Sequence, residues 1–429
     1  MGAENSKRKA SPKTAFKKRV CSFLNLASPT KDISAQTIER AWKDKLDSEL
    51  FAKLQRVIFK SHTAISFESF ADFYYKLVEG TVDDKASVVF SIVNPKNEDC
   101  ADLSALQSYV ANVLNTLVNL HRGSKEFSKW NDIGRPPAFY SCDNLALYIT
   151  KDMPESFALE KLENWYNGNA IFKRVSDYVY QSAFSVYEDH RTFIPLPVQD
   201  ALVNIKGTTI LTLGDILFLN SALLAENTVK WRLLYSSSVH GQSWQTLCKC
   251  ILGQGPTLIV IEDEHNAVIG AFGSASWRLS PSFYGNDSSF LFALRPQLSL
   301  MTPTGFNSNF QYINSGAATL PNGMGFGGKL EYFGLFLSSD FGKGKVSNSC
   351  TTYNNFKLPN DPKDFDIKHM EVWGVGKPDP TPEELGERRT CLDQDPTASA
   401  LLEMAGKTMH SKDLRQAKPE DEYLENCSR

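Results

Sequence analysis

The apolar pattern of the chain changes period near residue 207. Before this point apolar residues recur three or four positions apart, as Ile38, Trp42 and Leu46 do, which is the spacing of one helix face. After it, short apolar and aromatic runs follow each other closely, for example at 230–236 and 257–261. We therefore predict an α+β protein, with helices first and an antiparallel β-sandwich with short flanking helices second.

The chain has 429 residues, which is enough for two or three domains. Composition and pattern predict four parts: a disordered basic arm (1–32), a helical region (33–207) with a linker near 123–137, a β-sandwich (208–376) and an acidic tail (377–429). Within the tail, Asp395 and Pro396 suit the start of a helix, so we predict a short helix near 396–405.

The N-terminus matches a lipidation signal. The first residues read Met1-Gly2-Ala3-Glu4-Asn5-Ser6, in which Gly2 is the acceptor for myristate once Met1 is removed. One acyl chain binds a membrane weakly and needs a second signal. Positive charge supplies one, and we predict that an anionic membrane surface is contacted by Lys7, Arg8, Lys9, Lys13, Lys17, Lys18 and Arg19.

Charge and hydropathy exclude several protein classes. The net charge of −3 does not indicate a nucleic-acid binder. We find neither a run of about 18 apolar residues nor a secretory signal, which places the chain in the cytosol. Its eight cysteines are then expected to be thiols, and Cys21 either takes a reversible palmitate or stays free.

The segment from Asn94 to Ala105 lies between two predicted helices, where an EF-hand has its calcium loop. It places Lys96 at the third ligand position, Asp99 where the turn needs glycine, and Ala105 where a bidentate glutamate belongs. Calcium needs six to eight oxygen ligands. We predict an EF-hand-like helix pair that binds no calcium.

Motifs for phosphate, cofactor or acyl chemistry are weak or absent. Gly323-x-Gly325-x-x-Gly328 fits the dinucleotide fingerprint, but a strand-like run follows it where a helix is needed, so we interpret it as tight turns. There is no Walker A motif, and the sequence around Ser243 lacks the second glycine of a nucleophile elbow. We predict no cofactor.

The cysteines leave one catalytic alternative open. Cys248 and Cys250 lack the spacing of a zinc site, so we predict no metal. A nucleophile formed by His240 with Cys248, Cys250 or Cys350 requires an exposed thiol of low pKa. We favour a buried, inert Cys248 and predict no catalytic residue.

Nine segments in fixed order, between about 208 and 376, resemble the TLDc domain. They are Trp231-Arg-Leu-Leu-Tyr-Ser-Ser, His240-Gly-Gln-Ser-Trp, Gly255-Pro-Thr-Leu-Ile-Val-Ile-Glu-Asp, Val268-Ile-Gly-Ala-Phe, Gly325-Phe-Gly-Gly, Tyr332-Phe-Gly-Leu-Phe-Leu, Asp340-Phe-Gly-Lys-Gly, Cys350-Thr-Thr-Tyr-Asn and Met370-Glu-Val-Trp-Gly-Val-Gly. The resemblance implies a two-sheet β-sandwich and offers no catalytic residues.

The acylation signal, the EF-hand-like half and the tail segment Asp393-Gln-Asp-Pro-Thr-Ala-Ser-Ala-Leu-Leu-Glu resemble the lysosomal, MTOR-associated branch of TLDc proteins. This implies a non-enzymatic peripheral membrane adaptor at the cytosolic face of lysosomes, also present in the cytoplasm. It would support MTOR signalling and bind the vacuolar-type proton ATPase (V-ATPase). In the predicted tail helix Leu401, Leu402 and Ala405 share one apolar face, and we favour docking of this face on a partner over docking on the chain's own sandwich. The alternative is a thiol-dependent antioxidant or hydrolytic enzyme with its site in the TLDc domain.

Overall fold

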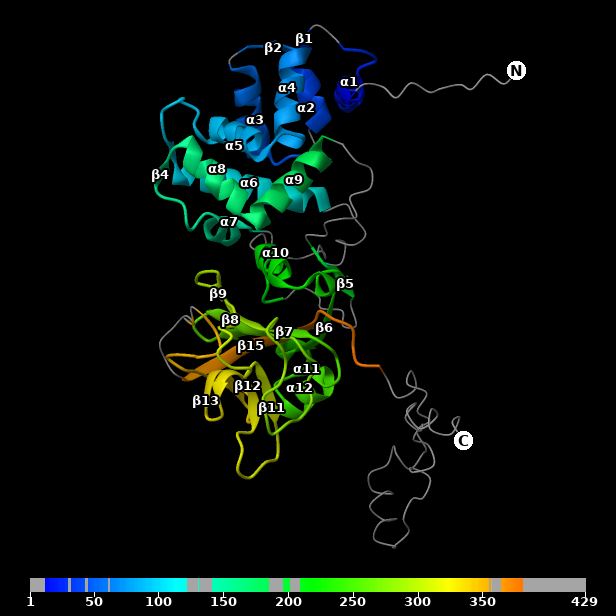
Figure 1. The fold of residues 1–429 in the computed structure, drawn as a ribbon. Helices are drawn as coiled ribbons and strands as arrows, with labels where there is room; N and C mark the ends of the chain where they lie inside the picture. Colours follow the sequence, from blue (N-terminus) through cyan, green and yellow to red (C-terminus); the bar gives the residue numbers. More distant parts are fainter. Residues whose placement is uncertain are drawn as a thin grey trace, which may run out of the picture. The chain divides into compact units, whose positions relative to one another are not determined.

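The computed structural model describes residues 12–29, 32–42, 45–60, 62–121, 130, 141–184, 196–200, 209–354, 356 and 364–380. The chain divides into two compact units, 1–378 and 379–429, and the fold below is that of the first. It contains a helical region (12–184) and a β region (196–378), as the ribbon in Figure 1 shows. The α+β prediction is confirmed.

The helical region consists of short helices separated by loops with very short strands. Its elements are α1 (Pro12–Phe23), β1 (Asp32–Ser34), α2 (Ala35–Trp42), α3 (Ser48–Phe59), β2 (Ala64–Ser66), α4 (Phe67–Val78), α5 (Val82–Val93), β3 (Ala101–Asp102), α6 (Leu103–His121), α7 (Asp143–Ile149), β4 (Ser156–Phe157), α8 (Leu159–Gly168) and α9 (Ala170–Ala183). Strand β1 pairs with β2, and β3 pairs with β4, both antiparallel. In an EF-hand-like pair, the loops of two helix–loop–helix units form a short antiparallel strand pair. The pairs β1–β2 and β3–β4 have this arrangement.

Local signals in the sequence explain where these helices begin. The Asp47 side chain accepts hydrogen bonds from the backbone N–H groups of Glu49 and Leu50 at the start of α3. Thr81 and Asp84 form a capping box at the start of α5. The predicted stripes are buried as expected, with Trp42 at the end of α2 only 1% exposed.

Helix α1 corrects the prediction of a disordered arm over residues 1–32. The Phe23 side chain is buried, and its ring centroid lies 5.1 Å from that of Phe184 and 5.9 Å from that of Trp42. Val20 is also fully buried. The dense positive charge hid the apolar positions Phe16, Val20 and Phe23, whose three- and four-residue spacing places them on one helix face.

The β region begins with a parallel strand pair and continues as an antiparallel sheet. Its elements are β5 (Val198–Asp200), α10 (Leu213–Ala222), η2 (Ala225–Asn227), β6 (Lys230–Ser236), α11 (Ser237–His240), α12 (Trp244–Ile251), β7 (Thr257–Asp263), β8 (Val268–Gly273), β9 (Phe290–Arg295), β10 (Ser299–Met301), β11 (Gln311–Asn314), β12 (Gly323–Lys329), β13 (Tyr332–Ser338), β14 (Lys343–Val346) and β15 (Asp364–Gly374). The hydrogen-bonded order is β10-β9-β8-β7-β15-β14-β13-β12-β11, with β6 also on β15 and β5 beside β6.

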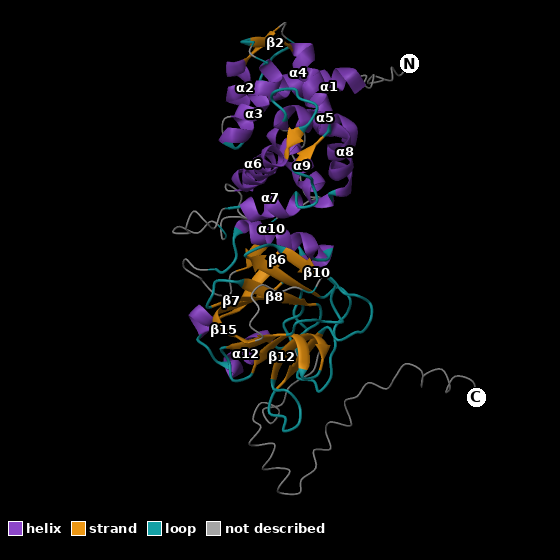
Figure 2. Ribbon diagram, turned by 90° about the vertical axis from the view of Figure 1, so that its left-hand side faces the viewer, coloured by secondary structure: helices purple, strands orange, loops and turns teal. Residues whose placement is uncertain are grey.

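The long strand β15 joins two layers of strands, which Figure 2 shows lying over each other. One end of β15 pairs with β14, and the other end pairs with β7 and β6. The core between the layers includes Ile259 and Leu291 from one side and Phe326 and Leu335 from the other. The predicted sandwich is therefore present, with both layers belonging to one continuous hydrogen-bonded sheet.

The structure differs from two of our predictions, the domain boundary at residue 207 and the linker at 123–137. Strand β5 lies before the boundary, yet it pairs with β6 inside the β region. Trp130 lies in the predicted linker but is fully buried, with its ring 5.4 Å from that of Trp373 and its Nε1 donating to the carbonyl of Pro197 at 2.7 Å. The sequence around Trp130 is polar, so its pattern gave no sign of this contact.

Glycines 323 and 325 lie within strand β12, and the strand β13 follows, so these positions are not the tight turns we predicted. A Cβ added at Gly325 would lie 2.3 Å from the Phe333 ring, and one at Gly323 would lie 2.6 Å from the Phe336 ring. The glycines therefore leave room for aromatic rings that cross from β13. The absence of a following helix agrees with our rejection of a dinucleotide site.

Candidate functional site

Helix α10 connects the helical region to the β region and is buried on all sides. Every residue from Leu213 to Asn220 is buried. Burial is expected for a helix that is apolar on all sides. The Phe218 ring meets the Tyr148 ring of α7 at 4.8 Å. At Gly214 an added Cβ would lie 2.9 Å from the carbonyl oxygen of Ser141, so the two segments are in close contact.

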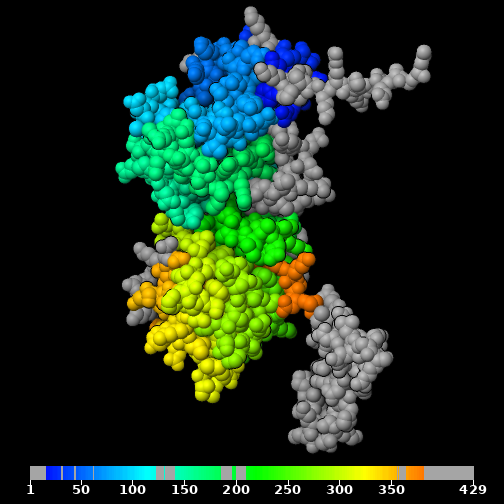
Figure 3. Space-filling model, viewed as in Figure 1, coloured from blue at the N-terminus to red at the C-terminus, as the bar shows by residue number. Residues whose placement is uncertain are grey.

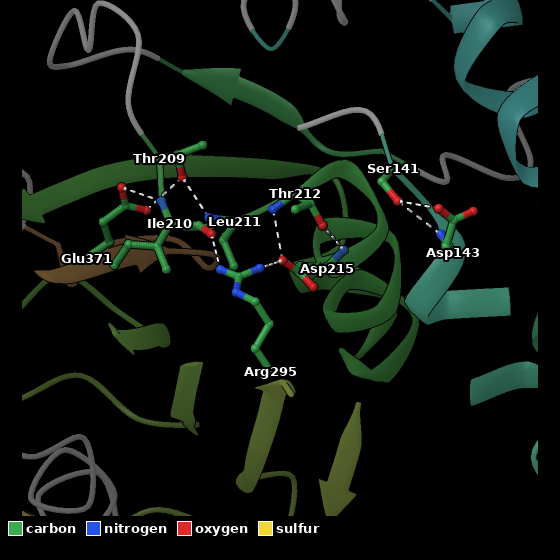
Figure 4. A network of polar contacts seen from close by, with 9 residues as sticks. All are labelled: Ser141, Asp143, Thr209, Ile210, Leu211, Thr212, Asp215, Arg295 and Glu371. Atoms are coloured by element: carbon green, nitrogen blue, oxygen red, sulfur yellow. Dashed lines mark hydrogen bonds and ion pairs between the residues drawn. The ribbon is translucent and has the colours of Figure 1, made fainter. Parts of the chain in front are cut away.

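A buried polar network fixes α10 to the sheet (Figure 4). The Asp215 carboxylate accepts from Arg295 Nη1 at 3.0 Å and from the Thr212 backbone N–H at 2.9 Å, while Thr212 Oγ1 accepts from the Asp215 N–H. Burial raises the pKa of Asp215, and Arg295 and Thr212 oppose that shift. The carboxylate is held by partners that stabilise its charged form.

Glu371 of β15 is the second buried acid in this network. Its side chain is 2% exposed and accepts from Thr209 Oγ1 at 2.8 Å, from the Ile210 backbone N–H at 3.1 Å and from Trp373 Nε1 at 3.0 Å. These partners all belong to the chain itself. We therefore assign the network a structural role, which is to hold the segment 209–215 on the sheet.

The prediction that Cys248 is buried is wrong, because Cys248, Cys250 and Cys350 are all partly exposed. Cys248 and Cys250 nevertheless lack the surroundings of a reactive thiol. Burial raises the pKa of Cys248 to about 11, and burial also raises the pKa of Cys250 against the opposing charge of Lys249. A reactive thiol needs the opposite shift. His240 stacks on Tyr235, and its Nδ1 lies 3.1 Å from the Ser236 backbone nitrogen. This geometry does not favour the thiol-enzyme alternative.

The degenerate EF-hand loop is closed by its own side chains. Asn94 Oδ1 accepts from the Glu98 backbone N–H at 3.1 Å, and Lys96 Nζ lies 3.8 Å from Glu98 Oε1. Ala101 pairs with Phe157 in the small sheet β3–β4. Within the described ranges, no group of three or more His, Cys, Asp or Glu side chains is arranged to hold a metal ion. That this loop binds no calcium stays a prediction.

The predicted membrane-contact residues fall into two groups. Gly2, Lys7, Arg8 and Lys9 lie outside the described residues, as do the predicted tail residues Leu401, Leu402 and Ala405, and the Lys13 side chain is not described. In α1, Lys18 is exposed, whereas Lys17 pairs with Glu68 at 2.6 Å and Arg19 with Glu79 at 2.5 Å.

Two further observations bear on membrane attachment. Cys21 is buried and burial raises its pKa, which favours a free thiol over a palmitoylated one. No helix in the described part of the chain is long and apolar enough to cross a membrane. Membrane contact by the basic residues stays a prediction.

A groove on the β region is the feature that sequence analysis missed. It has a volume of about 980 Å³ and lies where β12, β13 and β14 meet the loops near residues 306–309 and 347–351. Phe306 is 79% exposed and Tyr332 is 64% exposed at this site. The rings of Phe333 and Phe336, 4.8 Å apart and stacked, also line it. In the space-filling view of Figure 3, the stretch from 306 to 351 that contributes the lining has the yellow tones of the bar.

Comparison with known proteins gives the family. Residues 205–376 match the TLDc domain. The MTOR-associated protein MEAK7 of Xenopus laevis is 32% identical over 428 residues, which cover 92% of each chain. This chain belongs to the TLDc-domain family and is a homologue of MEAK7. The MEAK7 of Homo sapiens is 30% identical over 376 residues, covering 83% of this chain and 81% of that protein.

The TLDc similarity extends to proteins of different organisation. Nuclear receptor coactivator 7 of Homo sapiens is 38% identical over 144 residues, which are 33% of this chain and only 14% of that protein. The MEAK7 proteins of Xenopus laevis and Homo sapiens, in contrast, cover 92% and 83% of this chain, so their matches include both the helical region and the TLDc domain. The resemblance to TLDc proteins predicted from the sequence is therefore confirmed.

Proposed function

We propose that this TLDc protein is a non-enzymatic peripheral membrane adaptor at the cytosolic face of lysosomes, which supports MTOR signalling and binds the V-ATPase. The observation that supports it most is similarity across 92% of both this chain and Xenopus laevis MEAK7, whose name states an association with MTOR. A protein that shares both the helical region and the TLDc domain is a better guide to function than a protein that shares the TLDc domain alone.

The MTOR part is tested by removing the protein from cells and restoring it. We expect nutrient-stimulated phosphorylation of MTOR substrates to fall without the protein and to recover with the full chain. Recovery with a chain in which Asp215→Ala disrupts α10 packing is expected to be poor. Unchanged phosphorylation in the depleted cells would contradict the proposal.

The membrane part depends on the acyl chain and on the positive charge that follows it in the sequence. Gly2→Ala is expected to move most of the protein from membranes to cytosol. Neutralising Lys7, Arg8 and Lys9 is expected to weaken vesicle binding, and high salt to imitate that loss. The matched control neutralises Lys17 and Arg19, whose charges already pair with Glu68 and Glu79, and is expected to have the smaller effect. Membrane binding unaffected by Gly2→Ala would contradict a lipid anchor.

The V-ATPase part is tested through the tail. Replacing Leu401 and Leu402 together by Asp is expected to abolish co-purification with the V-ATPase from lysosomal membranes, because helix-in-groove binding depends on a few apolar anchors. The melting temperature is expected to stay unchanged. A large fall in melting temperature would instead make these leucines part of the protein's own core.

The adaptor and the thiol enzyme differ in cysteine reactivity. With the pKa of Cys248 near 11, about one thiol in a thousand is ionised at pH 8. Cys100 is exposed, so we expect iodoacetamide to label Cys248 at least about tenfold more slowly than Cys100. Faster labelling of Cys248 than of Cys100, read by peptide mass spectrometry, would restore the enzyme alternative.

A further inference from the structure

We propose that the groove at β12–β14 binds a short extended peptide of a partner protein, with acidic residues around one bulky apolar side chain. This goes beyond the lysosomal and MTOR assignments and does not depend on them. The argument rests on the apolar lining of the groove, on its rigid rim, on its charge and on its concave form.

Some of the apolar side chains that line the groove are exposed. Phe333 forms part of it and is itself 5% exposed, because its ring lies over Gly325 and packs against Tyr312 at 5.3 Å. Phe306 and Tyr332, in contrast, remain mostly exposed at the same groove. Exposed aromatic side chains beside a cavity are typical of protein-binding sites, where such residues supply much of the affinity.

Side-chain hydrogen bonds hold the loop that presents Phe306. Thr304 Oγ1 donates to the Thr351 carbonyl at 2.7 Å and accepts from the Phe306 backbone N–H at 3.1 Å. Asn307 donates to Thr351 Oγ1 at 3.0 Å and accepts from Thr352 Oγ1 at 2.7 Å. The rim is thus fixed before a ligand arrives, which reduces the entropy lost on binding.

The charges that line the groove favour an acidic ligand. Lys329 and Lys345 line it, and Glu331 is the one carboxylate among the described lining residues. Lys329 Nζ lies 5.0 Å from the Tyr332 ring centroid, so a ligand carboxylate and an aromatic contact would meet at the same place. Lys345 is 3.9 Å from Asp364, but both side chains are exposed and such pairs are weak.

The concave form favours a peptide over a lipid surface. A membrane-binding surface presents its apolar side chains on a protruding face, whereas here a volume of about 980 Å³ lies between the rims. Cavities of this size match ligands of drug size. A short extended segment with one bulky side chain fits both the lining and the two lysines.

The test uses the purified full chain and fluorescein-labelled acidic hexapeptides of the form Glu-Asp-Leu-X-Asp-Glu, where X is Leu, Phe, Tyr or Trp. Fluorescence anisotropy is expected to show saturable binding of at least one peptide. Binding is expected to weaken at least about tenfold with Phe306→Ala, and Lys329→Glu is expected to shift preference to the basic peptide Lys-Arg-Leu-Phe-Arg-Lys. Leu279→Ala removes another exposed apolar side chain, outside the groove lining, and is expected to change nothing.

Three results would overturn the proposal. The first is absence of saturable binding by any acidic peptide up to about 1 mM, or equal binding of acidic and basic peptides. The second is binding of anionic vesicles that Phe306→Ala abolishes while no peptide binds, which would assign the groove to a membrane. The third is a dimer, seen by sedimentation, that Phe306→Ala dissociates, which would make a second copy of the chain the occupant.

Discussion

The helical region covers the ring of Phe184 with its own helices, whereas the β region leaves an apolar groove open. Phe184, which follows α9, lies among α1, α2 and α4 with its ring 4.5 Å from Tyr74, 5.1 Å from Phe23 and 5.2 Å from Trp42. In the β region Phe306 and Tyr332 remain exposed at a groove of about 980 Å³. Side chains of the helical region thus cover Phe184, whereas exposed apolar side chains line the groove of the β region.

The largest expected effect on the unfolding free energy comes from removing the Phe184 ring. Phe184→Ala removes a ring that is 1% exposed and leaves a cavity among three aromatic neighbours. Such a change costs about 3–5 kcal/mol of unfolding free energy, to be measured by urea denaturation. A loss below about 1 kcal/mol would mean that the Phe184 ring does not fill the interior of the helical region and that the contrast between the two regions is wrong.

The second effect concerns the buried ion pair below α10. Asp215→Ala leaves the Arg295 guanidinium without its carboxylate, and removing one partner of such a pair costs about 3 kcal/mol. The matched control is Asp366→Ala, which removes the partner of Lys343 at an exposed pair and is expected to cost less than about 1 kcal/mol. Equal losses in the two variants would show that the pair of Asp215 and Arg295 does not stabilise the packing of α10 on the sheet.

A smaller effect probes the contact between α7 and α10. Gly214→Ala adds a Cβ that would lie 2.9 Å from the Ser141 carbonyl oxygen, so α7 and α10 must separate, at about 1–2 kcal/mol. Gly168→Ala, at the end of α8, meets nothing within 4 Å and is expected to be neutral or slightly stabilising. If both alanines stabilise the protein in thermal unfolding, the junction is not tightly packed.

The smallest expected effect on the unfolding free energy comes from removing the Phe306 ring of the β region. Phe306→Ala removes a ring that is 79% exposed, so the unfolding free energy is expected to change by less than about 0.5 kcal/mol. Together with Phe184→Ala, this compares two phenylalanines of the same size in closed and open surroundings. A loss above about 1 kcal/mol would make Phe306 part of the fold and remove the main reason to treat the groove as a binding site.

Several elements were predictable because their signals lie within a few residues. The helix stripe through Trp42 is buried as expected, and Ser243 caps α12 by accepting from the Thr246 backbone N–H. The runs at 257–261 and 268–272 form the hairpin β7–β8. The family could be identified from short sequence segments that occur in a fixed order along the chain.

The candidate site was not predictable, because its residues come from positions that meet only in the fold. Phe306, Lys329 and Lys345 are separated in sequence, and the groove that they line exists only once β12, β13 and β14 pair. The alternation of glycine and aromatic residues between 323 and 336 is a signal that could have suggested rings lying across a neighbouring strand. Sequence analysis took those glycines for turns.

The sequence by itself determined the change from helices to strands, the helix caps and the family, since periodicity and capping act between residues a few positions apart. Only the tertiary structure decided which apolar side chains are covered. Phe184 and Phe306 have the same side chain, yet one is 1% exposed and the other 79%. Burial depends on segments distant in the chain, here α1, α2 and α4 around Phe184, and local pattern carries no information about which of them meet.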